Sequence, residues 1–220
     1  MSVELGKIEK PPVEEFKTGR KLCYVPLIYG SKNLPADYLK LYNKYWKQVD
    51  GQISGLESKL RPTNRIYHEF ISSIGKNGLK VLKSLNQKSF EIVRKRIGKG
   101  AQLEAIEDGE LLTEFMDWNR CLMIGLQNHK VLERVYNFYT EATDRRKEFI
   151  SNHIDETLKA DEIGILFMKE DNQIKFPAGV EIFYVSPPAL DEIKRWLKNQ
   201  ETQQLEKDKD QEGKVEAATN

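Results

Sequence analysis

Cysteine is nearly absent from this chain, which has only two, Cys23 and Cys121, among 220 residues. Both lie in apolar stretches, and no CxxC pair or other metal-ligand spacing surrounds them. Two cysteines of this kind form neither the disulfide framework of a small secreted domain nor the ligand set of a zinc site. We therefore expect free, buried thiols and a cytoplasmic protein, because the cytosol keeps thiols reduced.

Long apolar runs are also missing. The longest, such as Ile163–Met168 and Ile182–Val185, have the length of a strand, whereas a membrane-spanning helix needs about 20 apolar residues. The first 20 residues mix acids, bases and two prolines, and they contain no apolar stretch typical of a secretory signal. The sequence therefore predicts no contact with a membrane.

Glycine-rich phosphate loops and histidine motifs are absent as well. The sequence contains no GxGxxG, GxxxxGK(S/T) or GxSxG pattern, which argues against a Rossmann dehydrogenase and a P-loop NTPase. His68, His129 and His153 share no HxxH or HExxH spacing. We interpret them as ordinary histidines, except that His68 stands beside Glu69 on an expected strand and is a candidate site residue.

The chain has almost no net charge, since 35 Lys and Arg residues against 34 Asp and Glu residues give +1. This balance excludes a uniformly basic or uniformly acidic protein. The charges are nevertheless separated: residues 76–99 contain eight bases and one acid, and residues 104–117 contain six acids and no base. Such a basic segment is able to contact nucleic-acid phosphates. We favour a second interpretation, in which the two segments pair with each other within the chain or in a dimer.

Strand-like and helix-like segments alternate along the chain. Short apolar runs predict strands, and apolar residues at three- and four-residue steps predict helices. The expected strands are Lys21–Tyr29, Arg65–Ile71, Ala101–Ile106, Glu162–Met168 and Val180–Val185, and the expected helices cover 35–60, 79–85, 90–97, 109–126, 131–158 and 189–198. This order predicts an α/β fold: a single three-layer domain with about five mostly parallel strands covered by helices, and a helical insertion before the fourth strand.

The two ends of the chain differ from the folded body, which we place at residues 21–198. Residues 1–20 contain Pro11 and Pro12, so we expect a flexible N-terminal segment. Residues 199–220 have few apolar side chains, which predicts a disordered charged tail, with at most a frayed continuation of the preceding helix.

Two details of the body stay open at this stage. The last two strands are joined by residues 169–179 alone, which allows a loop connection or an antiparallel pair. Gly51 and Gly55 interrupt the first long helix, and we interpret them as places where another backbone packs close.

Carboxylates follow three of the five expected strands: Glu69, then Glu107 and Asp108, then Glu170 and Asp171. Because ligands bind outside the carboxyl ends of parallel strands, we expect these side chains to meet on one rim. Such a cluster suits a divalent cation, Mg²⁺ or Mn²⁺, with Glu69, Asp108 and His68 as catalytic residues. In the alternative interpretation, which we weigh more heavily, the acids cap helices, as Asp108 before Gly109 would.

Four further residues are candidate ligand contacts. Ser31 and Lys32 follow the first strand, where they would hold a phosphate, although an exposed turn is the simpler interpretation. Trp118 offers a flat apolar face and Arg120 a cation, but the spacing of Arg120 from Asp117 favours a helical ion pair. The run Asp144-Arg145-Arg146 is interpreted in the same way, as an exposed charged turn.

Parts of the sequence resemble an uncharacterised prokaryotic protein family. The similarity covers residues 21–198 and is carried by YVPLIYG, by EDGELLTEFMDWNRCL, by the stretch from RRKEFISNHIDETL to GILFMKEDN, and by FPAGVEIFYVSPPALDEIKRWL. That family has no established activity, so the resemblance implies no functional residue.

The chain also resembles, in its first strand and in a later helix–strand pair, the erythromycin-esterase and TraB/Tiki hydrolase architecture. That group places a histidine after its first strand, where this chain has Tyr29-Gly30. It places a Gly-x-x-His pattern near the late strand, where this chain has Lys169-Glu170-Asp171-Asn172. Both departures remove the residues that would carry such chemistry.

These features together lead us to expect small-ligand binding in a carboxylate-lined cleft at the strand ends, with metal-assisted hydrolysis where a divalent cation binds. One alternative is a non-enzymatic module that binds RNA or an acidic partner through residues 76–99. Another is a structural subunit of a homo-oligomer.

Overall fold

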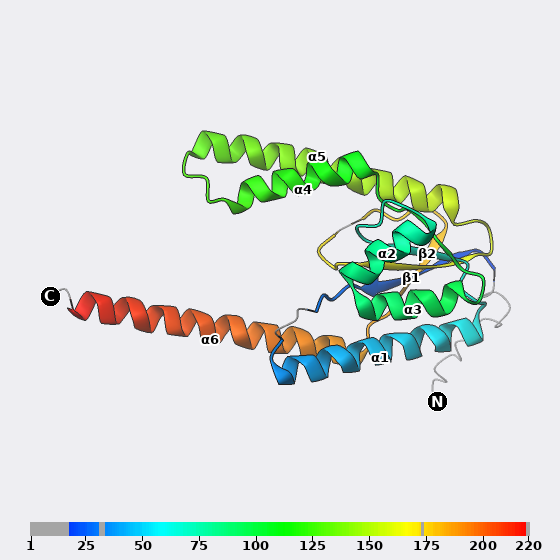
Figure 1. Cartoon of the computed structure of the whole chain (residues 1–220), viewed down its shortest axis with the longest axis horizontal. Helices are drawn as coiled ribbons and strands as arrows, with labels where there is room; N and C mark the ends of the chain where they lie inside the picture. The colour runs from blue at the N-terminus through cyan, green and yellow to red at the C-terminus, as the bar shows by residue number, and fades with distance from the viewer. Residues whose placement is uncertain (1–17, 31–33, 173, 219–220) are drawn as a thin grey trace, which may run out of the picture.

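A computed structural model describes residues 18–30, 34–172 and 174–218 of the chain, with side chains through residue 203 (Figure 1). The strands are β1 (Arg20–Pro26), β2 (Arg65–His68), β3 (Gln102–Leu103), β4 (Ile163–Met168) and β5 (Val180–Tyr184). The helices are α1 (Ala36–Lys59), α2 (Gly75–Leu85), α3 (Gln87–Ile97), α4 (Gly109–Met123), α5 (His129–Thr157) and α6 (Pro188–Ala218). The predicted flexibility of the N-terminus concerns mainly residues 1–17, which lie outside this range.

The five strands form one sheet in the order β3-β2-β4-β1-β5, and every neighbouring pair is parallel. β4 lies between β2 and β1, and it is buried along its whole length, as its run of apolar residues predicts. α4 and α5 stand between β3 and β4 in the sequence. The predicted α/β fold with a helical insertion before the fourth strand is therefore confirmed.

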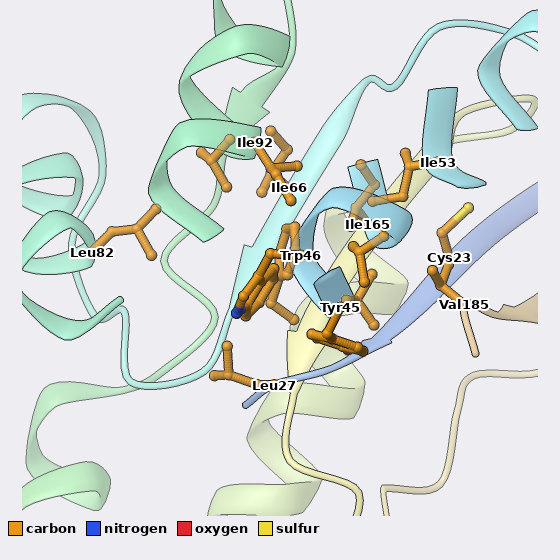
Figure 2. Packing of buried hydrophobic residues seen from close by; sticks show 14 of the residues in the cluster. Cys23, Leu27, Tyr45, Trp46, Ile53, Ile66, Leu82, Ile92, Ile165 and Val185 are labelled. Carbon is orange, nitrogen blue, oxygen red and sulfur yellow. The ribbon is translucent and has the colours of Figure 1, made fainter. Parts of the chain in front are cut away.

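Two apolar cores cover the two faces of this sheet, because successive strand residues point in opposite directions. Cys23 and Ile165 belong to the core under α1, α2, α3 and α6, which also contains Tyr45 and Trp46 (Figure 2). The other core lies under α5 and contains Leu22, Tyr24, Leu166, Ile150 and Ile154. The domain therefore has three layers, and α5 is the helix that supplies the core residues on one side of the sheet.

Three strands end earlier than the sequence suggests. β2 ends at His68 because the chain turns sharply at Phe70, whose φ is 67°. β3 has only two residues, since it lies at the edge and pairs with β2 alone. β1 ends at Pro26, which has no N–H to donate to a neighbouring strand. At the end of a strand this loss costs fewer hydrogen bonds than it would in the middle.

The connection between the last two strands resolves the first open detail. β5 is parallel to β1 rather than antiparallel to β4, so the connection crosses β1, and its described residues, 169–172 and 174–179, form no helix. Ile174 and Phe176 of this connection pack into the core beneath α5. A crossover helix is usually needed to cover the apolar face of the sheet. Here the side chains of this loop cover part of that face instead.

α6 continues far beyond Lys198, where the apolar periodicity ends, and reaches Ala218. The structure thus forms a helix over most of the segment for which the composition predicts disorder. The residues there are rich in Gln, Glu, Lys and Ala, which have high intrinsic helix propensity. No helix among the described residues combines the length and apolarity that crossing a bilayer requires.

Candidate functional site

A buried ion cluster lies at the carboxyl end of the sheet and consists of Glu69, Glu107 and Arg146. The Arg146 guanidinium donates to both Glu107 oxygens, at 2.7 Å from Nε and 2.5 Å from a terminal nitrogen. The same terminal nitrogen lies 3.5 Å from Glu69 Oε1. No more than 2% of any of these three side chains is exposed. The geometry is the bidentate arrangement that makes an Arg–carboxylate pair strong.

Three separate elements bring these charges together. Glu69 follows β2, Glu107 follows β3, and Arg146 lies in the middle of α5. The rings of Phe70 and Phe115 lie 5.3 and 4.8 Å from the guanidinium, so aromatic faces complete its surroundings. The Phe70 backbone N–H donates to Glu107 at 3.0 Å, which ties the turn after β2 to the segment after β3.

Glu69 also joins the cluster to the end of β4. Its Oε2 accepts the backbone N–H of Lys169 at 3.0 Å, and its Oε1 accepts the Asn172 amide at 2.5 Å. Burial raises the pKa of the Glu69 carboxyl group above its ordinary value, against the lowering effect of the Lys169 N–H and of Arg146. Two carboxylates facing one guanidinium leave one uncompensated charge, and burial makes that charge costly.

His68 lies on the opposite side of the sheet from the Glu69 carboxylate, because neighbouring strand residues alternate. Its ring is fully buried, stacks on Phe167, and is hydrogen-bonded to Ser89 Oγ at 2.9 Å and to the Glu69 carbonyl oxygen at 2.8 Å. Burial lowers the pKa of His68 to about 4, so the ring is neutral near pH 7. The structure places this predicted catalytic residue in the core beneath α3.

The buried neutral state of His68 predicts a loss of stability in acid. Its pKa is about 6.5 in the unfolded chain and about 4 in the folded one. Between these values only the unfolded chain takes up the proton, so the free energy of unfolding should fall by about 3 kcal/mol as the pH drops from 7 to 4. Urea denaturation at several pH values should show this slope in the wild type and lack it in His68→Gln. Parallel pH profiles for the two proteins would contradict the prediction.

The five carboxylates expected on one rim do not meet as a group. Glu69 and Glu107 come together, but around Arg146. The Asp108 side chain accepts the backbone N–H groups of Glu110 and Leu111, both at 2.9 Å, and so caps α4, as the alternative interpretation holds. Glu170 pairs with Lys194 at 2.7 Å, and Asp171 is exposed. Among the described residues, no three or more His, Cys, Asp or Glu side chains form a group that could hold a metal ion.

The other predicted ligand contacts fall in different places. Ser31 and Lys32 lie outside the described residues. Trp118 stacks on Phe138 at 4.8 Å within the α4–α5 pair. Arg120 pairs with Asp117 at 2.7 Å on the exposed side of α4, so the preferred interpretation of that spacing is confirmed.

The charged segments do not pair with each other. Within 34–172, where both segments are described, no ion pair joins residues 76–99 to residues 104–117. Lys95 and Arg96 reach Asp50 of α1 instead, and Arg96 also reaches Glu57. The favoured interpretation is therefore wrong within the chain, because α1 rather than α4 lies beside α3.

Arg146 is the residue that the sequence analysis misplaced most clearly. It is not an exposed charge but one of the largest fully buried side chains. A signal was present, since Ala142, Arg146, Ile150 and Ile154 follow at four-residue steps and are the buried residues of α5. A single arginine in an otherwise apolar helical stripe indicates a buried partner of opposite charge.

A cavity of about 370 Å³ opens beside the ion cluster, at the carboxyl ends of β1 and β4. Its apolar wall comes from three elements of the chain, and its rim carries Lys169, Glu170, Asp171 and Lys194. The apolar lining residues are Leu27, Ile28, Tyr38, Leu190, Ile193 and Leu197. We call this cavity the crevice.

The topology explains why a crevice forms there. After β1 the chain turns to α1 on one face of the sheet. After β4 it passes to the other face, where Ile174 and Phe176 pack with the α5 core. Neighbouring parallel strands whose connections diverge to opposite faces leave a gap at their carboxyl ends, and ligands of open α/β sheets bind at this point.

Tyr29 stands between the crevice and the ion cluster. It lines the crevice, and the ammonium of Lys169 lies 5.5 Å from the centre of its ring. Its hydroxyl is buried and has no hydrogen-bond partner among the described residues. Burial and then the Glu69 carboxylate raise the pKa of this hydroxyl. A polar atom left without a partner beside a cavity is suited to receive one from a ligand.

We compared the chain with models of known protein families, with curated proteins and with solved structures, and none of them matched.

Proposed function

We propose that this protein binds a small organic ligand in the crevice at the carboxyl ends of β1 and β4. The observation that carries the proposal is the position of the crevice, where the connections of two neighbouring parallel strands diverge. The volume of about 370 Å³ lies in the range of small-molecule pockets. The apolar wall with a few charged groups at the rim has the composition of such a pocket.

The lining indicates a ligand with an apolar body and an anionic group. Leu190, Ile193 and Leu197 of α6 offer apolar surface, which favours a hydrocarbon or aromatic body. Among the rim charges, Lys194 is already paired with Glu170. Lys169 rests on the Tyr29 ring and has no carboxylate within 4.0 Å among the described residues, so its ammonium is the group that would meet an anion.

Acid–base chemistry, as in the expected hydrolysis, would fall to Glu69 in this proposal. Of the three predicted catalytic residues it alone belongs to the ion cluster, and its bonds to Asn172 and to the Lys169 backbone join the cluster to the end of β4. Burial raises the pKa of its carboxyl group above the ordinary value, which is the direction that a general acid or base requires.

Titration with 8-anilino-1-naphthalenesulfonate tests the proposal, because this fluorescent probe has an aromatic body and a sulfonate. We expect saturable binding to the full chain and at least about tenfold weaker binding to Leu197→Glu, which places a charge on the apolar wall. Lys169→Ala should weaken binding as well.

Two matched variants control for effects elsewhere. Leu39 has the same exposed fraction as Leu197, 44%, but lies on α1 outside the crevice. Lys80 is an exposed lysine of α2. Leu39→Glu and Lys80→Ala should bind the probe as the wild type does. Equal affinities for Leu197→Glu and Leu39→Glu would overturn the proposal.

A further inference from the structure

The α4–α5 hairpin has an apolar face that nothing in the described chain covers. None of the 15 residues of α4 is buried, and the buried residues of α5 begin only at Ala142. Figure 1 shows the hairpin projecting past the end of the sheet, on the side to which the far part of α6 also extends, with a gap between the two ribbons in this view. Six large apolar side chains of the two helices are exposed: Met116 at 39%, Met123 at 78%, Val131 at 46%, Leu132 at 38%, Tyr136 at 58% and Phe138 at 45%.

Two of the exposed apolar residues of α5, Leu132 and Tyr136, lie on the same face as its buried ones. Leu132 precedes Ile150 by 18 residues, and Tyr136 precedes Ile154 by the same number. Eighteen residues make about five full turns of an α-helix, so each pair points in one direction. Ile150 and Ile154 are buried against the sheet. α5 therefore keeps one apolar face for its whole length, but only its second half has a sheet to cover it.

Met116 and Met123 extend this face onto α4. The ring contacts Phe115–Tyr139 and Trp118–Phe138 fix the sides by which the two helices touch. We measure each residue's direction around its helix axis from the direction that points to the other helix, at about 100° per residue. On α4, Met116 and Met123 lie about 110–130° from that direction. On α5, Leu132 and Tyr136 lie about 70–110° from it. All four angles have the same sense when each helix is viewed from its own N-terminus. Because the helices are antiparallel, the four side chains therefore lie on the same side of the hairpin. The ion pair Glu114–Arg145, at 2.5 Å, marks the opposite side.

The two sides of the hairpin differ in charge. The same projection places Glu110, Asp117, Arg134 and Glu141 on the side of the Glu114–Arg145 pair. The apolar side consists of Leu112, Met116, Asn119, Met123, Leu132, Tyr136, Tyr139 and Thr143, and none of these carries a charge. His129 and Lys147 of α5 border this side at its two ends. We call this second side the uncharged face.

We infer that the uncharged face binds the same face of a second copy of this chain, so that two hairpins form an antiparallel four-helix bundle. A two-helix hairpin is half of such a bundle and buries its apolar residues only when a second layer joins it. A two-fold axis brings a surface against its own copy, and a charged face would then repel itself. The uncharged face lacks that repulsion, so it is suited to bind its own copy.

The size of the face predicts how tightly the copies associate. α4 has 15 residues and is therefore about 22 Å long, and two adjacent helices are about 20 Å wide. The two faces then cover about 900 Å² in total, which is below the range of stable interfaces and in the range of weak, transient ones. We expect a dimer with a dissociation constant in the micromolar range.

Sedimentation velocity of the full chain from about 1 to 200 μM tests this inference. The wild type should shift from monomer to dimer within this range. Met116→Glu combined with Leu132→Glu places four carboxylates in the interface of a dimer, which should raise the dissociation constant at least about 100-fold. A matched variant, Thr113→Glu combined with Asn137→Glu, adds the same charge at exposed positions away from the uncharged face and should dimerise as the wild type does.

Far-UV circular dichroism of both variants establishes that the hairpin is still folded when association is lost. A wild type that stays monomeric at 200 μM would overturn the inference. A dimer that both variants retain would overturn it as well, since association would then use another surface. The same follows if both variants dissociate equally. Probe binding in the crevice is measured independently, so either proposal is able to fail without the other.

Discussion

Replacing Arg146 by Met should lower the free energy of unfolding by about 3–5 kcal/mol. The change removes the guanidinium that both Glu69 and Glu107 face and leaves two carboxylates in a site where at most 2% of either side chain is exposed. Removing one partner of a buried ion pair costs far more than the pair itself contributes, because the remaining charge has lost its water and gained nothing. Urea denaturation at pH 7 measures the loss.

Arg145→Met is the matched control for this prediction. Arg145 is the preceding residue of α5 and also pairs with a glutamate, Glu114, but 52% and 38% of the two side chains are exposed. An exposed pair of this kind contributes about 1 kcal/mol or less. Equal losses for Arg145→Met and Arg146→Met would show that burial does not determine the role of Arg146.

A second variant separates the effect of charge from the effect of packing. Adding Glu107→Gln to Arg146→Met keeps the shape of the Glu107 side chain and removes its charge. We expect the double variant to recover part of the lost stability, because an unpaired amide costs less to bury than an unpaired carboxylate. The loss in Arg146→Met should also become smaller as the pH is lowered, since the Glu69 carboxyl group, whose pKa burial raises, then takes up a proton.

Replacing Gly78 by Ala should lower the free energy of unfolding by about 2–3 kcal/mol. Gly78 is buried near the start of α2, and a Cβ atom there would overlap the carbonyl oxygen of Ser73. That oxygen belongs to the backbone, so the turn before α2 would have to move. Thermal or urea denaturation of the variant would measure the loss.

Gly51→Ala is expected to act in the opposite direction. A Cβ atom at Gly51, or at Gly55, meets nothing within 4 Å, so the interpretation that another backbone packs close to α1 at these positions is wrong. Alanine has the higher helix propensity, and Gly51→Ala should stabilise the protein by up to about 1 kcal/mol. If Gly78→Ala and Gly51→Ala shifted stability in the same direction, the explanation from steric overlap at Gly78 would fail.

Some residues of the candidate site could be predicted from the sequence, and others could not. Glu69 and Glu107 stand out in the sequence because each follows a strand, and the carboxyl edge of a parallel sheet gathers such residues. The same rule brought Asp108 and His68 into the prediction. Asp108 caps a helix and His68 points to the other face of the sheet, because one residue along the chain changes the direction of a side chain.

The sequence by itself determined the elements of this protein, since the periodicity of apolar residues is a local property. It predicted the buried central strand β4, the helical insertion, and the approach of residues 69 and 107 to one edge of the sheet. It did not reveal the strand order, the partner of Arg146 or the two strands, β1 and β4, at whose ends the crevice lies.

Tertiary structure alone decided those features, and the reason is distance along the chain. Arg146 meets Glu107 across 39 residues and Glu69 across 77, and the Lys169 N–H meets Glu69 across 100. Whether a charge is buried and paired depends on which elements pack around it, and no spacing within one helix or strand encodes that. The crevice likewise exists only because the connections after β1 and β4 leave the sheet on opposite faces.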